Sequence, residues 1–286
     1  MTMRFGFVLP FGDADDVGRA AVAAEQAGWD AIFAWEAVWG VDAWVSLTVA
    51  AERTTRIRLG TMLTPLPRVR PWDLASRVAT LDRLSGGRVQ LAVGLGAVHE
   101  GWTAFEPDEG RPRRVELLDE GLAVYDGLMH GQPFSYDGQH YRVRPTDFMV
   151  PAPPVQRPRV PVWVVGAYLP GREQQPSLER AARWDGLLPQ LVSGGQRGKP
   201  TTPQVLADLV TRVRARREDA RLPWAGYDVV FEGTSFGPAP TSPADPARWA
   251  AAGATWWVEG AWDLEPGEAG RTELARRIDA GPPVGR

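Results

Sequence analysis

Short apolar runs alternate along the chain with longer stretches in which apolar positions recur at helical spacing. Residues 81–96 (LDRLSGGRVQLAVGLG) contain one complete unit: Leu81 and Leu84 lie one helical turn apart, and Gly86 and Gly87 favour a left-handed helix end. The apolar run that follows has no polar alternation, which is typical of a parallel strand buried on both faces. The segment therefore predicts a helix, a turn and a buried strand in succession.

The same unit recurs along the whole chain, and this recurrence predicts the fold class. About eight strand–helix units in 286 residues match an α/β fold of the (β/α)₈ barrel type. We predict it as one domain over residues 1–286; a doubly wound open sheet is the alternative, but it would leave some units unexplained. Strands are predicted at 4–10, 31–36, 57–63, 89–95, 160–166, 186–189, 228–233 and 255–259, and helices at 15–28, 43–53, 72–84, 177–184, 203–217, 245–252 and 269–279.

The interval 97–159, between the fourth and fifth strands, is too long for a simple crossover. It contains a helical segment at 113–131 and a hairpin-like segment (PFSYDGQHYRV). We therefore expect an insertion in the barrel at this point.

Composition narrows the possible partners. The hydrophobic fraction of 44% supports a large core, and 32 basic against 35 acidic residues give no field that would recruit nucleic acid. The absence of cysteine excludes disulfides and thiolate nucleophiles. No apolar stretch has the length of a membrane span or of a targeting segment, so we expect a cytoplasmic protein with no membrane partner.

Few residues are suited to polar catalysis. The single lysine, Lys199, lies in a loop rich in glycine and proline, which makes Schiff-base chemistry a poor fit. Of the histidines, only His99 follows directly after a strand exit, where it could act on a ligand; His130 and His140 have structural settings. A metal site is not expected, because neither the histidines nor the carboxylates have ligand spacing.

The functional face of such a barrel is formed by the loops after the strands. Aromatic, glycine and small polar residues dominate these exits, which suits a flat, mostly apolar ring system. The alternative is that the aromatic residues only plug the barrel mouth. The exits are 7–10, 35–36, 61–65, 94–100, 166–169, 188–190, 232–235 and 259–262.

Several segments, in the right order, resemble the bacterial luciferase-like family of flavin- and deazaflavin-dependent oxidoreductases. The resemblance implies a TIM barrel that binds reduced FMN or the deazaflavin coenzyme across its strand exits and acts on a small molecule. The segments are 23–35 (AAEQAGWDAIFAW), 56–71 (RIRLGTMLTPLPRVRP), 80–96, 113–131 with the turn at 138–141, 155–166 (VQRPRVPVWVVG) and 181–189 (AARWDGLLP).

The resemblance also assigns cofactor contacts to residues of this chain. It implies a backbone bulge at Thr61-Met62, often with a cis peptide, behind the ring system. It implies phosphate binding by backbone N–H groups after the fifth strand. In this chain Ser177 could cap a helix there and Arg172 and Arg180 could add charge, and we expect Gly166→Val to weaken cofactor affinity. The cofactor-binding residues that follow from the resemblance are Trp35, Thr61, Met62, Gly94, Gly96, Ala97, Gly166, Ala167, Tyr168, Ser177 and Pro189.

Two departures from the family pattern bear on the chemistry. Luciferase-like members follow the second-strand glutamate with histidines, whereas Glu36 is followed by Ala37 and Val38, which puts oxygenation in doubt. Deazaflavin-dependent sugar-phosphate dehydrogenases have a glutamate where this chain has Ala97. The candidate catalytic residues are Glu36, as a desolvated acid or base, and His99. An arginine partner that holds Glu36 as a structural anchor is the alternative.

The sequence thus predicts a luciferase-like oxidoreductase, either a monooxygenase or a hydride-transferring dehydrogenase or reductase, for a hydrophobic small molecule. Two alternatives stay open: a barrel glycoside hydrolase that uses Glu232 and Glu259 as its carboxylate pair, and a non-catalytic flavin-binding protein. Family members commonly pair through helices beside the early strands. Because the helix after Asp42 carries Trp44, Val45, Leu47 and Val49, we expect a homodimer.

Overall fold

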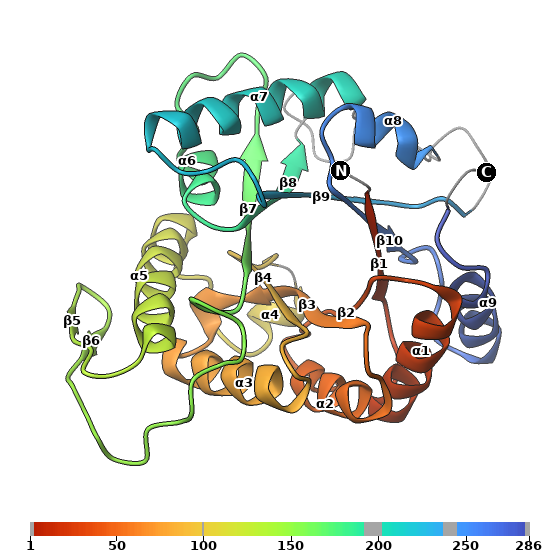
Figure 1. Ribbon diagram of the computed structural model, residues 1–286, viewed down its shortest axis with the longest axis horizontal. Helices are drawn as coiled ribbons and strands as arrows, with labels where there is room; N and C mark the ends of the chain where they lie inside the picture. Colours follow the sequence, from red (N-terminus) through yellow and green to blue (C-terminus); the bar gives the residue numbers. More distant parts are fainter. Residues whose placement is uncertain (1–2, 99, 192–201, 237–244, 284–286) are drawn as a thin grey trace.

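The computed structural model describes residues 3–98, 100–191, 202–236 and 245–283, and within them it shows a closed barrel of parallel strands (Figure 1). The strand order around the barrel is β1-β10-β9-β8-β7-β4-β3-β2. This closed ring confirms the predicted fold class and rules out the open sheet. The barrel strands are β1 (Arg4–Leu9), β2 (Ala31–Ala34), β3 (Arg58–Pro65), β4 (Val89–Gly94), β7 (Val162–Tyr168), β8 (Gly186–Leu191), β9 (Asp228–Gly233) and β10 (Trp256–Gly260).

Helices surround the strands, and their ends follow local sequence signals. Asp13 accepts a hydrogen bond from the Asp16 N–H in a capping box at the start of α1, and Gly28 ends this helix at φ 89°. Asp42 caps α2 through the N–H groups of its first turn. The helices of the ring are α1 (Ala14–Ala27), α2 (Ala43–Arg53), α3 (Pro71–Leu84), α5 (Arg111–His130), α6 (Pro176–Ala182), α7 (Pro203–Asp219), α8 (Pro246–Ala251) and α9 (Glu268–Asp279).

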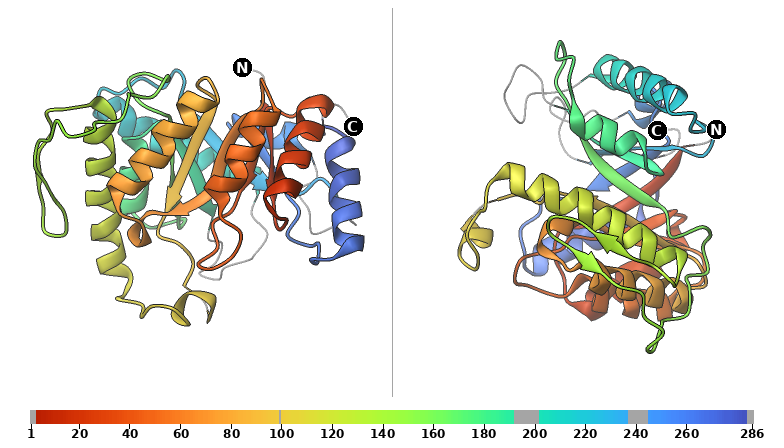
Figure 2. Two further views of the ribbon diagram at one scale, coloured as in Figure 1. Left: turned by 90° about the horizontal axis from the view of Figure 1, so that it is seen from below. Right: turned by 90° about the vertical axis from the view of Figure 1, so that its left-hand side faces the viewer.

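The insertion between the fourth and fifth barrel strands is smaller than predicted. The helix expected inside it, α5, lies in the ring between α3 and α6 and is the barrel's own helix after β4 (Figure 1). Outside the ring lie the hairpin of β5 (Tyr136–Asp137) and β6 (Arg142–Val143) and the loop that follows it (Figure 2). The Glu120 carboxylate on α5 accepts the backbone N–H groups of 139–141 and so fixes the hairpin turn to the helix.

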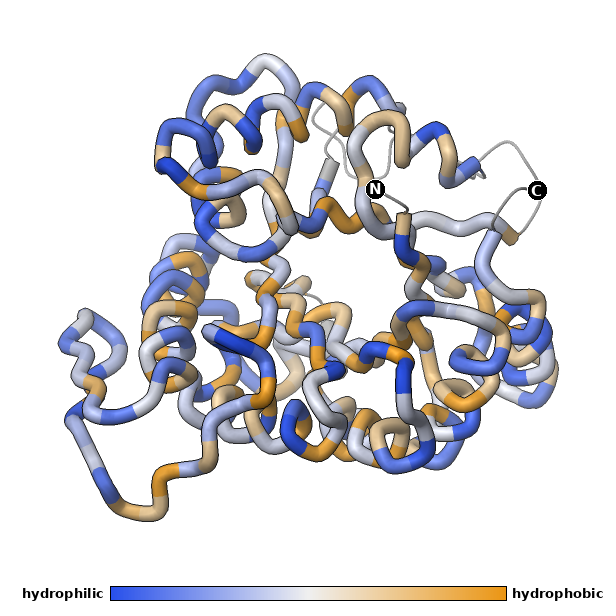
Figure 3. Tube along the Cα trace, viewed as in Figure 1, coloured by the Kyte–Doolittle hydropathy of each residue, from blue (hydrophilic) through white to orange (hydrophobic). Residues whose placement is uncertain are grey.

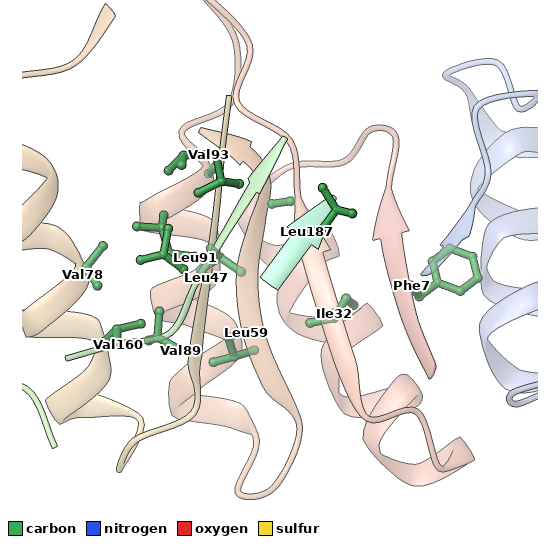
Figure 4. Packing of buried hydrophobic residues seen from close by; sticks show 14 of the residues in the cluster. Phe7, Ile32, Leu47, Leu59, Val78, Val89, Leu91, Val93, Val160 and Leu187 are labelled. Carbon is green, nitrogen blue, oxygen red and sulfur yellow. The ribbon is translucent and has the colours of Figure 1, made fainter. Parts of the chain in front are cut away.

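Two layers of apolar side chains form the core. The outer layer lies between strands and helices and includes Phe7, Ile32 and Leu187 (Figure 4). In Figure 3 hydrophobic and hydrophilic residues alternate along the ring helices, as expected for helices with one face on a sheet. None of the described helices is long and apolar enough to cross a membrane.

The inner layer fills the barrel itself below the strand exits. Trp163 and Trp256 pack edge to face there, with ring centroids 5.2 Å apart, and Phe33 contacts Trp163 from the other side. The Trp163 indole donates to the Asp228 carboxylate at 3.1 Å, so the buried N–H is satisfied. This plug closes the lumen, and any ligand must therefore bind above it, at the strand exits.

Candidate active site

A cavity of about 770 Å³ opens at the carboxyl ends of the barrel strands. Its volume lies within the range of small-molecule and cofactor sites. Of the predicted cofactor-binding residues, seven line it: Trp35, Met62, Gly96, Ala97, Ala167, Ser177 and Pro189. Glu36 also lines it, whereas Thr61, Gly94, Gly166 and Tyr168 do not. His99, the other predicted catalytic residue, lies outside the described residues.

The exit of β3 carries the irregular backbone that the sequence predicts, one peptide later than expected. The Met62–Leu63 peptide is cis, and the pairing of β3 with β4 shifts register between Thr61 and Thr64. The bulge turns Met62 and Leu63 into the cavity wall, while the hydroxyls of Thr61 and Thr64 hydrogen-bond to each other at 2.8 Å in the protein interior. The bulge therefore shapes the cavity through Met62 and Leu63, and Thr61 supports it from behind.

The exit of β7 differs from the predicted phosphate site. A Cβ on Gly166 would lie 2.4 Å from Cδ1 of Leu187 and 2.8 Å from Cδ2 of Leu178, so this glycine permits close packing of β7 on α6. Ser177 is not the helix cap, because α6 begins at Pro176 after Gln175. Its hydroxyl instead accepts the Ala167 N–H at 3.1 Å. That N–H is thus used within the protein and is not free to bind a phosphate. Gly166→Val would therefore test the packing of β7 on α6 and not the binding of the cofactor phosphate.

Glu36 lies at the β2 exit in a setting that favours its protonated form. The Trp44 indole donates to Oε1 at 3.0 Å, while Oε2 is buried and has no hydrogen-bond partner among the described residues. Burial raises the pKa of Glu36, and hydrogen bonding from Thr64 and Trp44 opposes this shift. No arginine of the described chain forms an ion pair with Glu36, which removes the anchoring alternative. Arg77 acts on the Glu36 pKa only as a nearby charge.

A second carboxyl group, Glu232 on β9, lines the same cavity. The Trp262 indole donates to its Oε1. The Glu232 side chain is exposed to the cavity, and the protein that surrounds it on the other sides removes water and raises its pKa. Glu259 on β10 does not line the cavity; its two oxygens accept the Ser235 N–H at 2.6 Å and the Trp257 indole at 2.9 Å. The two glutamates do not face one another across a substrate, so the glycoside hydrolase alternative is wrong.

A set of arginines lines the opposite wall, and the sequence pointed to only two of them, Arg172 and Arg180, as charge near the phosphate. They come from the segments after β3, β4 and β7. A second arc on the other side of the ring, from β2, β9 and β10, consists of Trp35, Glu36, Glu232 and Trp262. Two of the arginines start α5 one helical turn apart, in the sequence RPRR, which is the signal that was available. The arginine arc consists of Arg68, Arg111, Arg114, Arg172 and Arg180.

The ion pairs of the arginine arc are unequal. Arg180 is buried and donates to both oxygens of Asp119 on α5, with Nη2 at 2.8 Å. Arg68 pairs with Glu106, and Arg114 pairs with Asp108. Within the described part of the chain, Arg111 and Arg172 have no ion-pair partner, and both are exposed at the cavity. The arc therefore retains positive charge that is available to an anion.

Trp102 ties the short helix α4 (Glu100–Thr103) to the cavity wall. Its ring is 4% exposed and lies beneath the guanidinium groups of Arg68 and Arg114, at 5.0 and 5.6 Å from the ring centroid. Gly96, at φ 75°, leaves room for the ring, since a Cβ there would lie 2.5 Å from it. Among the described residues, no group of three or more histidine, aspartate or glutamate side chains is placed to hold a metal ion.

Comparison with known proteins places this geometry in context. A family model described as luciferase-like monooxygenase matches residues 3–191. A putative coenzyme F420-dependent oxidoreductase of Mycobacterium tuberculosis is 37% identical over 146 residues, which cover 49% of this chain and 41% of that protein. An F420-dependent glucose-6-phosphate dehydrogenase of Beutenbergia cavernae is 35% identical over 157 residues, 51% of this chain and 45% of that protein. The matches thus span less than half the length of these relatives.

Solved structures share the fold. The F420-dependent tetrahydromethanopterin reductase of Methanopyrus kandleri superposes with a TM-score of 0.75 at 17% identity and covers 98% of this chain and 97% of its own. A type II Baeyer–Villiger monooxygenase of Pseudomonas putida in complex with FMN superposes with a TM-score of 0.63 at 17% identity and covers 82% of this chain and 68% of its own.

Proposed function

The chain belongs to the luciferase-like monooxygenase family, and from this premise we propose that it is an oxidoreductase that uses the deazaflavin coenzyme F420 and transfers a hydride to or from a hydrophobic small molecule. The observation that carries the choice of coenzyme is the arginine arc. FMN bears one phosphate, whereas F420 bears a phosphodiester followed by several carboxylates. Arginine is suited to such groups because its planar fork binds them with two hydrogen bonds.

The cavity residues fit a coenzyme of this kind. Arg111 and Arg172 have no ion-pair partner in the described chain and are available for anionic groups, whereas Arg114 pairs with Asp108 at 3.4 Å. The cavity also offers apolar and aromatic surface, which suits a flat ring. This surface includes Met62 at the β3 bulge and Leu188 and Pro189 on β8. A coenzyme that spans the cavity would place its anionic tail against the arginine arc and its ring against the apolar surface.

When bound, the reduced deazaflavin supplies the hydride. The chain's own residues orient the ring and the substrate and exclude water. Glu36, with its raised pKa, holds a proton on a carboxyl oxygen beside the apolar wall, and the Trp44 indole fixes the orientation of that carboxyl group. Such a group is suited to give or accept a proton as charge develops on a substrate oxygen.

The test is a direct titration of the purified protein with F420, with FMN and with the deazaflavin chromophore that lacks the anionic tail. We expect F420 to bind more tightly than FMN, and its affinity to fall as salt rises, because the partly exposed arginines are screened. Arg111→Met and Arg172→Met should each weaken F420 binding by about tenfold, or about 1.4 kcal/mol, and leave binding of the tail-less chromophore unchanged.

Arg214→Met is the matched control, because Arg214 is an exposed arginine on α7 that pairs with Glu218 away from the cavity. It should not change any of the three affinities. Equal or tighter binding of FMN would contradict the proposal. Turnover of the reduced coenzyme with a panel of ketones, and of the oxidised coenzyme with a panel of alcohols, separates an enzyme from the non-catalytic alternative.

A further inference from the structure

We propose that Glu232, held by Trp262 above Gly260, is a specificity-determining hydrogen-bond donor that recognises an uncharged carbonyl or hydroxyl oxygen of the substrate. The part of the cavity around Glu232 would then select neutral, apolar molecules that carry one such oxygen and reject carboxylates and phosphates of similar size. This inference rests on the proposed function in one respect only: the coenzyme occupies the arginine arc, and the opposite side of the cavity, at Glu232 and Trp262, is left to the substrate.

The first support is the geometry of Glu232. On β9 it pairs in register with Val258, a residue of the barrel interior, and its side chain lines the cavity. The indole N–H of Trp262 is bound to Oε1. Oε2 has no hydrogen-bond partner in the described part of the chain, which leaves it available to a ligand.

Gly260 makes this arrangement possible. A Cβ at this position would lie 3.0 Å from Nε1 and Cδ1 of Trp262 and 3.1 Å from Oε1 of Glu232. Any larger residue would push the indole and the carboxyl group apart. The three residues therefore form one unit, in which β10 supplies the space and the indole and β9 supplies the carboxyl group.

The surroundings of Glu232 favour a neutral ligand. Burial raises its pKa, and only the Trp262 hydrogen bond opposes the shift; no charged side chain contributes. The titratable and charged groups that share the cavity are Glu36 and the arginine arc, and Glu259 lies behind the neighbouring strand. A protonated carboxyl group donates to a carbonyl or hydroxyl oxygen. An anionic substrate at this position would lose its hydration with no cation beside it, which is costly.

The neighbouring wall fits an apolar body attached to that oxygen. The rings of Trp35 and Trp262 pack edge to face with centroids 6.3 Å apart, and both are partly exposed to the cavity. The Trp35 indole donates to the Pro10 carbonyl at 3.0 Å, which fixes the ring. A flat or compact hydrocarbon can lie against these rings with its oxygen at Glu232.

The test compares acetophenone with benzoate, which have similar shapes but differ in the charge of the oxygen group. Their dissociation constants are measured by ligand-observed NMR across pH, with and without the coenzyme. Acetophenone should bind more tightly than benzoate, and its affinity should fall by about tenfold, about 1.4 kcal/mol, as pH rises through the raised pKa of Glu232. The sign follows because the donor exists only while the carboxyl group is protonated.

Three variants isolate the group responsible. Glu232→Gln keeps a donor, so acetophenone binding should persist while its pH dependence disappears. Trp262→Phe removes the hydrogen bond that lowers the Glu232 pKa, so the fall in affinity should move to higher pH. Glu36→Gln tests the other carboxyl group of the cavity. Melting temperatures verify that each variant is folded.

The inference is overturned if, with the coenzyme bound, benzoate binds as well as acetophenone or neither binds. It is also overturned if the pH dependence survives in Glu232→Gln and disappears in Glu36→Gln. These outcomes are separate from the coenzyme titration. A protein that binds F420 but fails this test retains the proposed function and loses the assignment of Glu232. A protein that binds FMN more tightly than F420, but distinguishes acetophenone from benzoate as predicted, loses the proposed coenzyme and retains the assignment of Glu232.

Discussion

Replacement of Gly96 by alanine should destabilise the protein through two separable effects. Gly96 has φ 75°, so an alanine there must adopt the left-handed region at a cost of about 1–2 kcal/mol. Its Cβ would also lie 2.5 Å from Cζ3 of Trp102 and 2.8 Å from Cβ of Pro65. Because Trp102 is buried and Pro65 belongs to β3, relief of this overlap should cost about 1–3 kcal/mol more.

The chain offers a matched control at Gly86. This glycine has φ 69°, but no heavy atom lies within 4 Å of the position of its Cβ. Gly86→Ala should therefore lower the free energy of unfolding by the backbone cost alone. Urea unfolding of both variants, with thermal midpoints as a second measurement, gives the difference, which we expect to be about 1–3 kcal/mol.

The same pair of variants has a functional readout. Arg68 and Arg114 lie over the Trp102 ring, so displacement of this ring in Gly96→Ala moves two guanidinium groups of the arginine arc. Coenzyme affinity should fall in Gly96→Ala and stay unchanged in Gly86→Ala. Equal losses of stability in the two variants, or equal affinities, would refute the packing of Trp102 on Gly96 as the support of this wall.

Three further predictions concern other parts of the molecule. Trp44→Phe removes a hydrogen bond to the Glu36 carboxyl group, so the Glu36 pKa should rise further. NMR of the labelled carboxyl carbon measures the pH at which Glu36 ionises, and a decrease would contradict the assignment of Trp44 as the donor. Gly166→Val should lower the free energy of unfolding by about 1–3 kcal/mol, because its side chain would overlap Leu187; unchanged stability in urea would contradict this. We also propose that the chain is a homodimer through α2, with a solution mass of twice 31.3 kDa by light scattering, which Val45→Asp should reduce; a monomeric wild type would refute it.

The fold was predictable because its signal is local and repeated. Each unit carries its own helix end and its own apolar run, as at 81–96, and the count of units then fixes the barrel. The extent of the insertion was not predictable in this way. The segment 113–131 has a helical pattern in either arrangement, and only packing against α3 decides that α5 belongs to the ring.

Apolar residues on α2 show a similar limit. The sequence predicts Trp44 and Leu47 as surface for a partner subunit, but they are 6% and 0% exposed within the chain. The Trp44 indole reaches the Glu36 carboxyl group instead. Val45 alone is exposed among the large residues at the start of this helix, so the expectation of a dimer now rests on the family resemblance and not on excess apolar area.

Glu232 and Glu259 had equal standing in the sequence, since both lie at the ends of adjacent strands. Strands buried on both faces have no polar alternation from which to read the direction of each side chain. The register of β9 against β10 decides it, and places Glu232 at the cavity and Glu259 behind the wall. A shift of one residue would exchange their roles. Which side chains of these two strands face the cavity is therefore decided by the closed barrel and not by either segment alone.

The division of the cavity into two arcs has the same origin. Strand order groups the exits of β2, β10 and β9 along one half of the ring and those of β3, β4 and β7 along the other, and the two halves meet where β2 pairs with β3. The arginine at 180 is buried only because Asp119, distant in sequence, meets it from α5. The arginines are thus confined to the arc formed after β3, β4 and β7, and the opposite arc carries two carboxyl groups with raised pKa values and two indoles. An elongated coenzyme with an anionic tail has one favourable direction in such a cavity, and that direction leaves Glu232 and Trp262 to the substrate.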